Sequence, residues 1–143
     1  MEKLLISACL LGVRCRYDGK SKPLPPETIE KLTARYDLVP VCPEQLGGLP
    51  TPRLPSERRG EEVIREDGTS ATEKYRRGAE EALRIARLTG CRKALLKARS
   101  PACGRGLVYD GTFSRTLIPG NGVTAQLLWQ NEIEVFTEEA LQL

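Results

Sequence analysis

The chain of 143 residues contains no histidine, and its five cysteines form no C-x-x-C pair. Structural zinc sites usually show histidine ligands or paired cysteines at such close spacing, so both absences argue against a structural zinc site. No apolar run approaches the ~20 residues that a membrane-spanning helix needs. The G-x-G-x-x-G pattern is also missing, which removes the sequence signature of a dinucleotide-binding loop.

Aromatic residues are sparse, with only two phenylalanines and one tryptophan. Proteins that bind single-stranded nucleic acids stack the bases on aromatic side chains, so this scarcity weakens such a role. The formal net charge is only +3, and no block of like charge resembles a nucleic-acid-binding tail. The charge permits phosphate binding without indicating it.

The cysteines are odd in number and unevenly spaced, which is atypical of a secreted disulfide framework. The apolar stretch before Cys9 is also shorter than the roughly 7–15-residue core of a secretory signal. We therefore expect a reducing, cytoplasmic setting in which thiols serve metals or catalysis. Because a chain of this length can bury roughly 68–70% of its unfolded surface, we expect one domain over residues 1–143 with no need of disulfides.

Apolar runs alternate with amphipathic stretches along the chain, a pattern that predicts an α/β layer fold. We expect strands at residues 3–8, 36–41, 93–96 and 133–136. One helix should begin at Pro25-Pro26, and two others should cover about 72–89 and 123–130. Since helices lie between the strands, the sheet should be mostly parallel. Pro40 lies inside the second strand, which places that strand at an edge of the sheet.

Two long segments, residues 43–70 and 97–120, do not fit a minimal layered fold. Long loops in a compact domain are usually functional or disordered, and both of these leave the carboxyl end of an expected strand. Within the first segment, residues 63–69 predict a hairpin that turns at Asp67-Gly68.

Three cysteines follow the ends of expected strands: Cys9, Cys42 and Cys103. In a parallel sheet, ligands bind outside the carboxyl ends of the strands, so these thiols should converge. Thiolates are soft ligands that favour zinc, copper(I) and iron–sulfur clusters. Each cysteine alone could be buried core filler, but their shared position favours a ligand set. A 4Fe–4S cluster held by three cysteines leaves one iron without a protein ligand, and that iron can act as a Lewis acid.

The remaining two cysteines are interpreted differently. Cys91 lies between a helix and the start of a strand, at the opposite edge of the sheet, and should be structural. Cys15 follows Cys9 by six residues and could reach the same site as a fourth ligand or a persulfide carrier. We favour the third alternative, an ordinary loop residue.

Two polar residues near the expected ligands could perform chemistry. Glu44 could activate water or carry a proton, and the hydroxyl of Ser100 could bond to the substrate or relay that proton. Equally, Glu44 could be a solvated loop charge and Ser100 part of a simple turn. The same loops hold several cations, which predicts an electropositive site for an anionic substrate or for cluster thiolates: Arg14, Arg16, Arg53, Lys97, Arg99 and Arg105.

Four segments taken together resemble one family, which includes the thiouracil desulfidases: SACLLG at 7–12, RYDG at 16–19, VCPEQLGGLPTPR at 41–53 and SPACG at 100–104. The resemblance covers nearly the whole chain. Ala102 departs from the pattern, since a second serine is frequent there.

This resemblance implies a Rossmann-like, three-layer α/β domain that holds a 4Fe–4S cluster through Cys9, Cys42 and Cys103, with one iron not bound by protein. It further implies that Glu44 and Ser100 form the catalytic pair. The implied reaction is non-redox removal of sulfur, as hydrosulfide, from a thiolated nucleobase, with thiolated RNA as a second candidate partner. Two other hypotheses remain: a cluster-containing sensor or RNA-binding module without turnover, and thiol redox catalysis by Cys9 and Cys15.

Overall fold

A four-stranded parallel sheet forms the centre of the protein, whose computed structural model describes residues 1–143. Its strands are β1 (Glu2–Ser7), β2 (Tyr36–Val41), β5 (Lys93–Leu96) and β8 (Glu134–Thr137), in the order β2-β1-β5-β8. The first strand is central, and the chain adds β2 on one side of it and β5 on the other. The carboxyl ends of all four strands therefore point to the same edge of the sheet.

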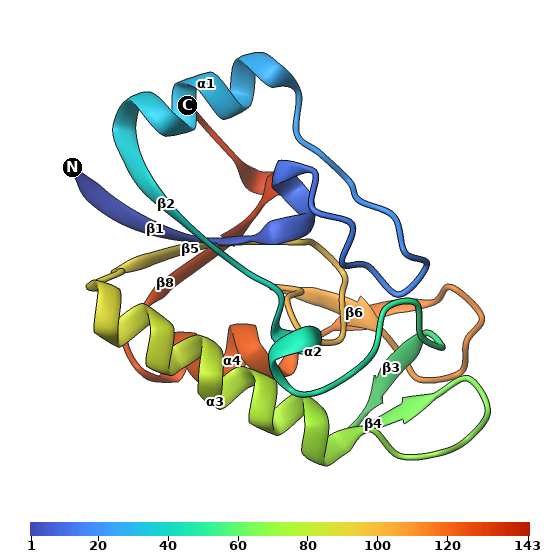
Figure 1. The fold of residues 1–143 in the computed structure, drawn as a ribbon. Coiled ribbons are helices and arrows are strands. Elements are labelled where there is room, and N and C mark those ends of the chain that lie inside the picture. Colours follow the sequence, from blue (N-terminus) through green and yellow to red (C-terminus); the bar gives the residue numbers. More distant parts are fainter.

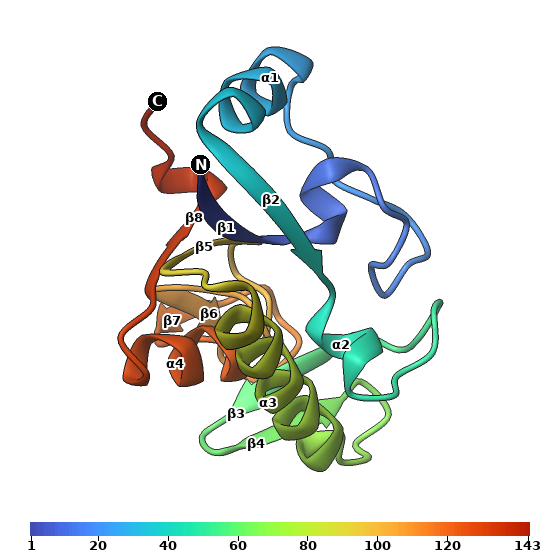
Figure 2. The same cartoon turned by 60° about the vertical axis from the view of Figure 1, so that its left-hand side comes forward.

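Helices cover both faces of this sheet, which gives the expected three layers (Figures 1 and 2). One face carries α1 (Pro26–Arg35), and the other carries α3 (Thr72–Thr89) and α4 (Val123–Gln130). Short helical turns follow three of the strands: η1 (Ala8–Leu11), α2 (Pro43–Leu46) and η2 (Glu138–Ala140). None of the helices combines the length and apolar character that a membrane-spanning segment requires.

The central strand shows why two cores form. Successive side chains of a strand point to opposite faces. Leu4 and Ile6 accordingly pack with Leu32 of α1, whereas Leu5 packs in the cluster that includes Leu83 of α3. All of these strand residues are fully buried, as expected for a parallel sheet covered on both sides.

The predicted element ends agree closely with the structure. Helix α3 ends where Gly90 adopts a left-handed conformation (φ 76°) and its amide caps the last turn. Strand β2, which contains Pro40, is an edge strand, as its proline requires. Both predictions are confirmed.

The two long segments are less irregular than expected. The first contains β3 (Ser56–Arg59) paired with β4 (Glu62–Arg65), so the main hairpin turns at Gly60 and not at Asp67-Gly68. A second tight turn does lie at Asp67-Gly68, but it supports only the isolated bridge between Ile64 and Ser70. The second segment contains another unpredicted pair, β6 (Leu107–Tyr109) with β7 (Leu117–Pro119).

A close backbone approach fixes α2 against α3. A Cβ atom added to Gly78 of α3 would overlap the carbonyl oxygen of Pro43, and one added to Gly47 would overlap that of Lys74. Only glycine permits this contact on both sides. The position of the loop that carries Cys42 and Glu44 is therefore set by a helix that comes much later in the chain.

Candidate functional site

A cavity of about 670 Å³ lies at the carboxyl edge of the sheet. Every strand of the sheet contributes to it through the turn or loop that follows the strand. Among the residues that line the cavity are all those predicted to form the site, together with a fourth thiol: Cys9, Cys42, Cys103, Glu44, Ser100 and Cys15.

The three predicted ligands reach the cavity from three adjacent strands. Cys9 lies in η1, directly after β1, and Cys42 precedes the first residue of α2, directly after β2. Cys103 lies in the loop after β5, where the first amides of α4 donate to the carbonyl oxygens of Pro101 and Ala102. The start of α4 thus holds the loop that carries Cys103.

Two serine hydroxyls surround the Cys103 thiol. Ser100 Oγ accepts the N–H groups of Ala102 and Cys103 at 3.1 Å each, and Ser7 Oγ accepts that of Lys97 at 2.9 Å. Both hydroxyls also interact with the Cys103 sulfur. Burial, helped by the charge of Glu44, raises the pKa of Cys103, so this thiol needs a cation if it is to become a thiolate.

Cys15 is buried in the same place, although sequence reasoning favoured an ordinary loop residue. Its thiol interacts with those of Cys42 and Cys9. The hydrogen bond with Cys42 lowers the pKa of Cys15, but the bond with Cys9 and burial outweigh it and raise that pKa to about 11. The Cys15 carbonyl accepts bonds from Cys42 Sγ at 3.6 Å and from Arg53 Nη2 at 2.9 Å.

Glu44 is a largely buried carboxylate, with 16% of its side chain exposed, and it faces Arg53 at 3.5 Å. Burial raises the pKa of Glu44, whereas the charge of Arg53 and, more weakly, that of Arg16 oppose the rise. Arg53 is held in turn by the carbonyl oxygens of Pro50 and Cys15. The carboxylate is therefore not a solvated loop charge.

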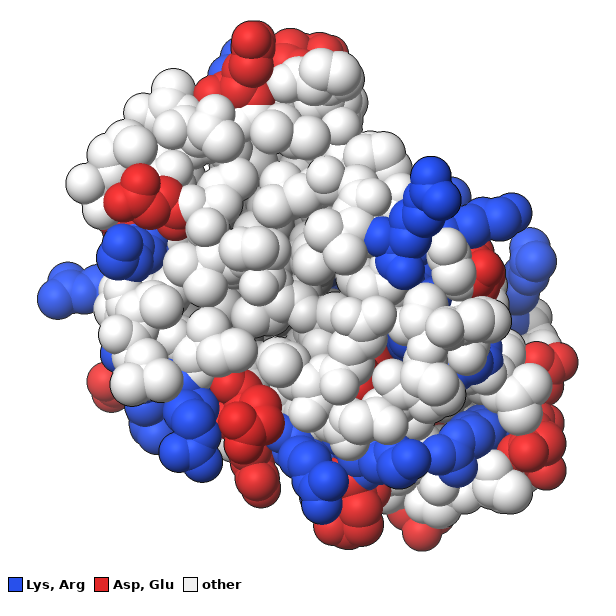
Figure 3. All heavy atoms as spheres, viewed as in Figure 1, with Lys and Arg blue, Asp and Glu red and all other residues white.

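The charges around the cavity differ from the electropositive site that the sequence predicted. Lys97 pairs with Glu138 at 2.7 Å and Arg99 with Glu139 at 2.8 Å, so two predicted cations meet carboxylates from the turn after β8. Arg14 and Arg105 do not line the cavity. Figure 3 shows basic and acidic side chains interspersed on the face it presents, without one continuous basic patch.

Comparison with known proteins agrees with this geometry. A family model described as 2-thiouracil desulfurase matches residues 4–140 of the chain. The chain belongs to this family. A solved structure, the 4Fe–4S-dependent thiouracil desulfidase TudS, is similar with a TM-score of 0.94 and 46% identity over 99% of this chain and 93% of that one. The uncharacterized protein YbbK of Bacillus subtilis (strain 168) is 40% identical, covering 96% of this chain and 97% of its own.

Membership of the 2-thiouracil desulfurase family confirms the resemblance and the prediction that the protein is an enzyme. The match to TudS confirms the three-layer α/β fold. The roles of the individual site residues stay predictions. The structure shows that all five line one cavity: Cys9, Cys42, Cys103, Glu44 and Ser100.

The donor set suits a cluster better than a single ion. No three acidic or thiol side chains converge closely enough to hold one metal ion. The thiols of this desulfurase-family protein are instead spread around one cavity, and an iron–sulfur cube spans more space than an ion does. Cys91, in contrast, lies in the apolar core away from the cavity, with only Thr89 Oγ1 close to its sulfur, at 3.3 Å.

Sequence reasoning missed several residues of the cavity wall. Glu138 and Glu139 follow the end of β8, so the rule that selected the cysteines would have selected them too. Tyr75 belongs to the helix expected over about 72–89, but helical spacing cannot distinguish a side chain that faces a core from one that faces a cavity. No local signal indicated Tyr109 or Phe113.

Proposed function

We propose that this protein removes sulfur, as hydrosulfide, from a thiolated nucleobase such as 2-thiouracil or from a related thiocarbonyl compound. The observation that carries this proposal is the convergence of three thiols, from three adjacent strands, on one cavity that also holds Glu44 and Ser100. Family membership and the similarity to TudS support it independently.

Cys9, Cys42 and Cys103 would hold a 4Fe–4S cluster. When bound, such a cluster supplies one iron without a protein ligand, a Lewis acid with affinity for sulfur. The two serine hydroxyls near Cys103 suit a thiolate at that position, because each can donate a hydrogen bond to a negatively charged sulfur.

Glu44 would act as the general base. A carboxylate with a raised pKa is a better proton acceptor than an exposed one, and the ion pair with Arg53 opposes the rise and orients the carboxylate. Glu44 takes a proton from a water molecule whose oxygen bonds to the carbon that bears sulfur. The carbon–sulfur bond then breaks, and sulfur leaves as hydrosulfide with the bonding electron pair. Carbon exchanges sulfur for oxygen, so no electron donor or acceptor is needed.

Ser100 would act as a hydrogen-bond donor in this reaction. Its oxygen already accepts two backbone N–H groups, which leaves the hydroxyl proton free to be donated. The hydroxyl can donate its hydrogen bond either to the Cys103 sulfur or to the sulfur of a bound substrate. In both cases the hydroxyl proton stabilises negative charge that gathers on sulfur.

A small molecule fits this cavity better than RNA does. Three cations of the wall already pair with carboxylates: Arg53 with Glu44, Lys97 with Glu138 and Arg99 with Glu139. Recognition of an RNA backbone depends on cations that are free to contact phosphates. The alternative of an RNA-binding module without turnover is therefore less well supported.

Anaerobic reconstitution tests the proposed function. The protein is purified without oxygen, loaded with iron and sulfide, and incubated with 2-thiouracil while uracil and hydrosulfide are measured. We expect about four irons per chain and equal amounts of the two products. A protein that carries the cluster but releases no hydrosulfide from any thiopyrimidine would disprove the substrate assignment.

A further inference from the structure

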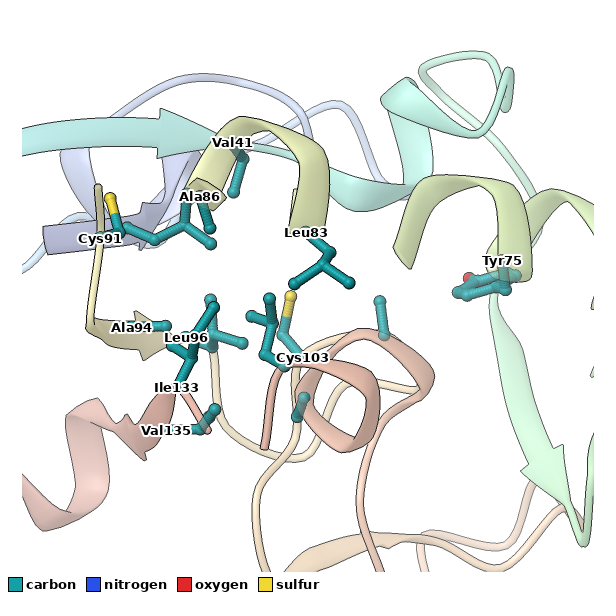
Figure 4. Packing of buried hydrophobic residues seen from close by; sticks show 14 of the residues in the cluster. Val41, Tyr75, Leu83, Ala86, Cys91, Ala94, Leu96, Cys103, Ile133 and Val135 are labelled. Atoms are coloured by element: carbon teal, nitrogen blue, oxygen red, sulfur yellow. The ribbon is translucent and has the colours of Figure 1, made fainter. Parts of the chain in front are cut away.

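Tyr75 is a buried aromatic residue whose side chain reaches the cavity. It lies in the first turns of α3 and is only 3% exposed, yet it lines the cavity together with Glu44 and Cys103. Figure 4 shows Tyr75 at one end of the hydrophobic cluster that also contains Cys103, with Leu83 next to Cys103. A buried tyrosine hydroxyl usually needs a hydrogen-bond partner.

The surroundings of the hydroxyl keep it protonated. Burial raises the pKa of Tyr75, and the negative charge of Glu44 raises it further. The hydroxyl interacts with the side chain of Ser56, which can accept or donate. Tyr75 is therefore a neutral donor at the cavity wall.

Several other donors of the wall are already engaged or enclosed. Arg53 donates to Pro50, Thr51 and Cys15, and its Nε is sealed from water without a partner, as is that of Arg16. Tyr75 itself lines the cavity, so its side chain is within reach of a ligand. The Ser100 hydroxyl, in turn, faces the Cys103 sulfur.

We propose that Tyr75 is a substrate-recognition residue, whose hydroxyl donates a hydrogen bond to the oxo group of a thiopyrimidine. The identity of the ligand rests on the proposed function. A thiouracil ring carries one thiocarbonyl and one oxo group, and the sulfur end faces the thiols. The oxo group then enters a buried space, where it loses water and needs a donor from the protein. A site built around such a bond discriminates strongly against analogues that lack the bonding atom.

The test compares two ligand pairs in the wild type and in Tyr75→Phe. For binding, uracil is compared with pyrimidin-2-one, which lacks the second oxo group, and affinity is measured by calorimetry on cluster-loaded protein. For turnover, 2-thiouracil is compared with pyrimidine-2-thione. The control is Tyr36→Phe, because Tyr36 lies at the start of β2 and does not line the cavity. Melting temperatures establish that both variants are folded.

We expect Tyr75→Phe to lower the affinity for uracil and the kcat/KM for 2-thiouracil about 10-fold or more. The affinity for pyrimidin-2-one and the kcat/KM for pyrimidine-2-thione should change less than about 2-fold. Tyr36→Phe should change neither. An equal loss for both ligands, or no loss, overturns the proposal, as does a wild type that does not bind uracil. If the wild type binds uracil through Tyr75 but releases no hydrosulfide, recognition stands and the proposed desulfidase function fails.

Discussion

The two edges of the sheet each contain a buried cysteine, and they show how different two such residues can be. Cys103 at the carboxyl edge and Cys91 at the amino edge belong to the same hydrophobic cluster and are 3% and 6% exposed. Figure 4 shows them well separated within it. Cys103 meets two serine hydroxyls and a cavity, whereas Cys91 meets Thr89 and closes the end of α3 with its amide. Burial alone thus does not tell the thiol that lines the cavity from the one that does not, whereas the end of the strand that it follows or precedes does.

Removing a thiol at each edge tests this contrast most strongly. Cys103→Ala, like Cys9→Ala and Cys42→Ala, should lower the iron content from about four per chain to near zero and abolish hydrosulfide release, because a cluster needs its thiolates. Cys91→Ala should keep iron and activity. Iron and sulfide analysis with an optical spectrum of anaerobically purified protein measures the difference.

Cys15→Ala makes this comparison sharper. If Cys15 is no ligand, its removal leaves the cluster in place although its thiol lies beside those of Cys9 and Cys42. Loss of iron in Cys91→Ala would contradict the contrast between the edges, and loss of iron in Cys15→Ala would require a fourth protein ligand.

At the carboxyl edge, loss of the proposed base should lower turnover without lowering iron content, unlike loss of a proposed ligand. Glu44→Gln keeps the shape of the side chain but removes its ability to take a proton, so we expect kcat to fall by about 10²–10⁴. Iron content should stay at the wild-type level. Glu66→Gln is a suitable control, because Glu66 also lines the cavity without facing Arg53. A Glu44→Gln variant with more than a tenth of wild-type turnover would rule out this role.

The glycines of the two edges should also respond differently. Gly78→Ala forces a methyl group into the carbonyl oxygen of Pro43, so we expect unfolding to become easier by about 2–3 kcal/mol and the cluster to be held less well. Gly90→Ala meets open space and pays only for its left-handed backbone, about 1 kcal/mol. Urea unfolding and iron content measure both effects. An iron loss in Gly90→Ala as large as in Gly78→Ala would contradict a special role of the α2–α3 contact in cluster retention.

The smallest effect concerns the ion pairs that the turn after β8 adds to the carboxyl edge. Glu139→Gln removes an exposed pair with Arg99, and no change in melting temperature is expected. Glu138→Ala leaves the Ala98 amide and Lys97 without their partner in a less exposed place, so about 1–2 kcal/mol of stability should be lost. A larger loss in Glu139→Gln than in Glu138→Ala would reverse this order.

The sequence predicted the sheet, its long helices and the site that follows its strands. The fold prediction is confirmed, and the predicted site residues do line one cavity, because apolar periodicity and strand direction are local or topological properties. Their roles stay predictions. Pro40 even indicated which strand lies at an edge, and Gly90 where α3 ends. The family motifs then supplied what physical reasoning could not, namely the substrate class.

The unpredicted parts depend on contacts between distant segments. The pairing of β6 with β7 and the true turn at Gly60 lie in stretches with weak periodicity. The pairing of Lys97 with Glu138 joins two loops, so counting cations in the sequence gave a more positive site than the fold produces. The same holds for Tyr75, because the sequence predicts its place in the helix but not the cavity that it faces.

The order of the strands has a consequence for how the holoenzyme is made. Cys42, Cys9 and Cys103 come from neighbours in space that are far apart along the chain, joined only by the ladders of β2 with β1 and of β1 with β5. No short peptide cut from this protein contains all three proposed sulfur donors. A cluster bound as proposed can therefore assemble only after the central ladders have formed, and metal uptake would report that the polypeptide has reached its native topology.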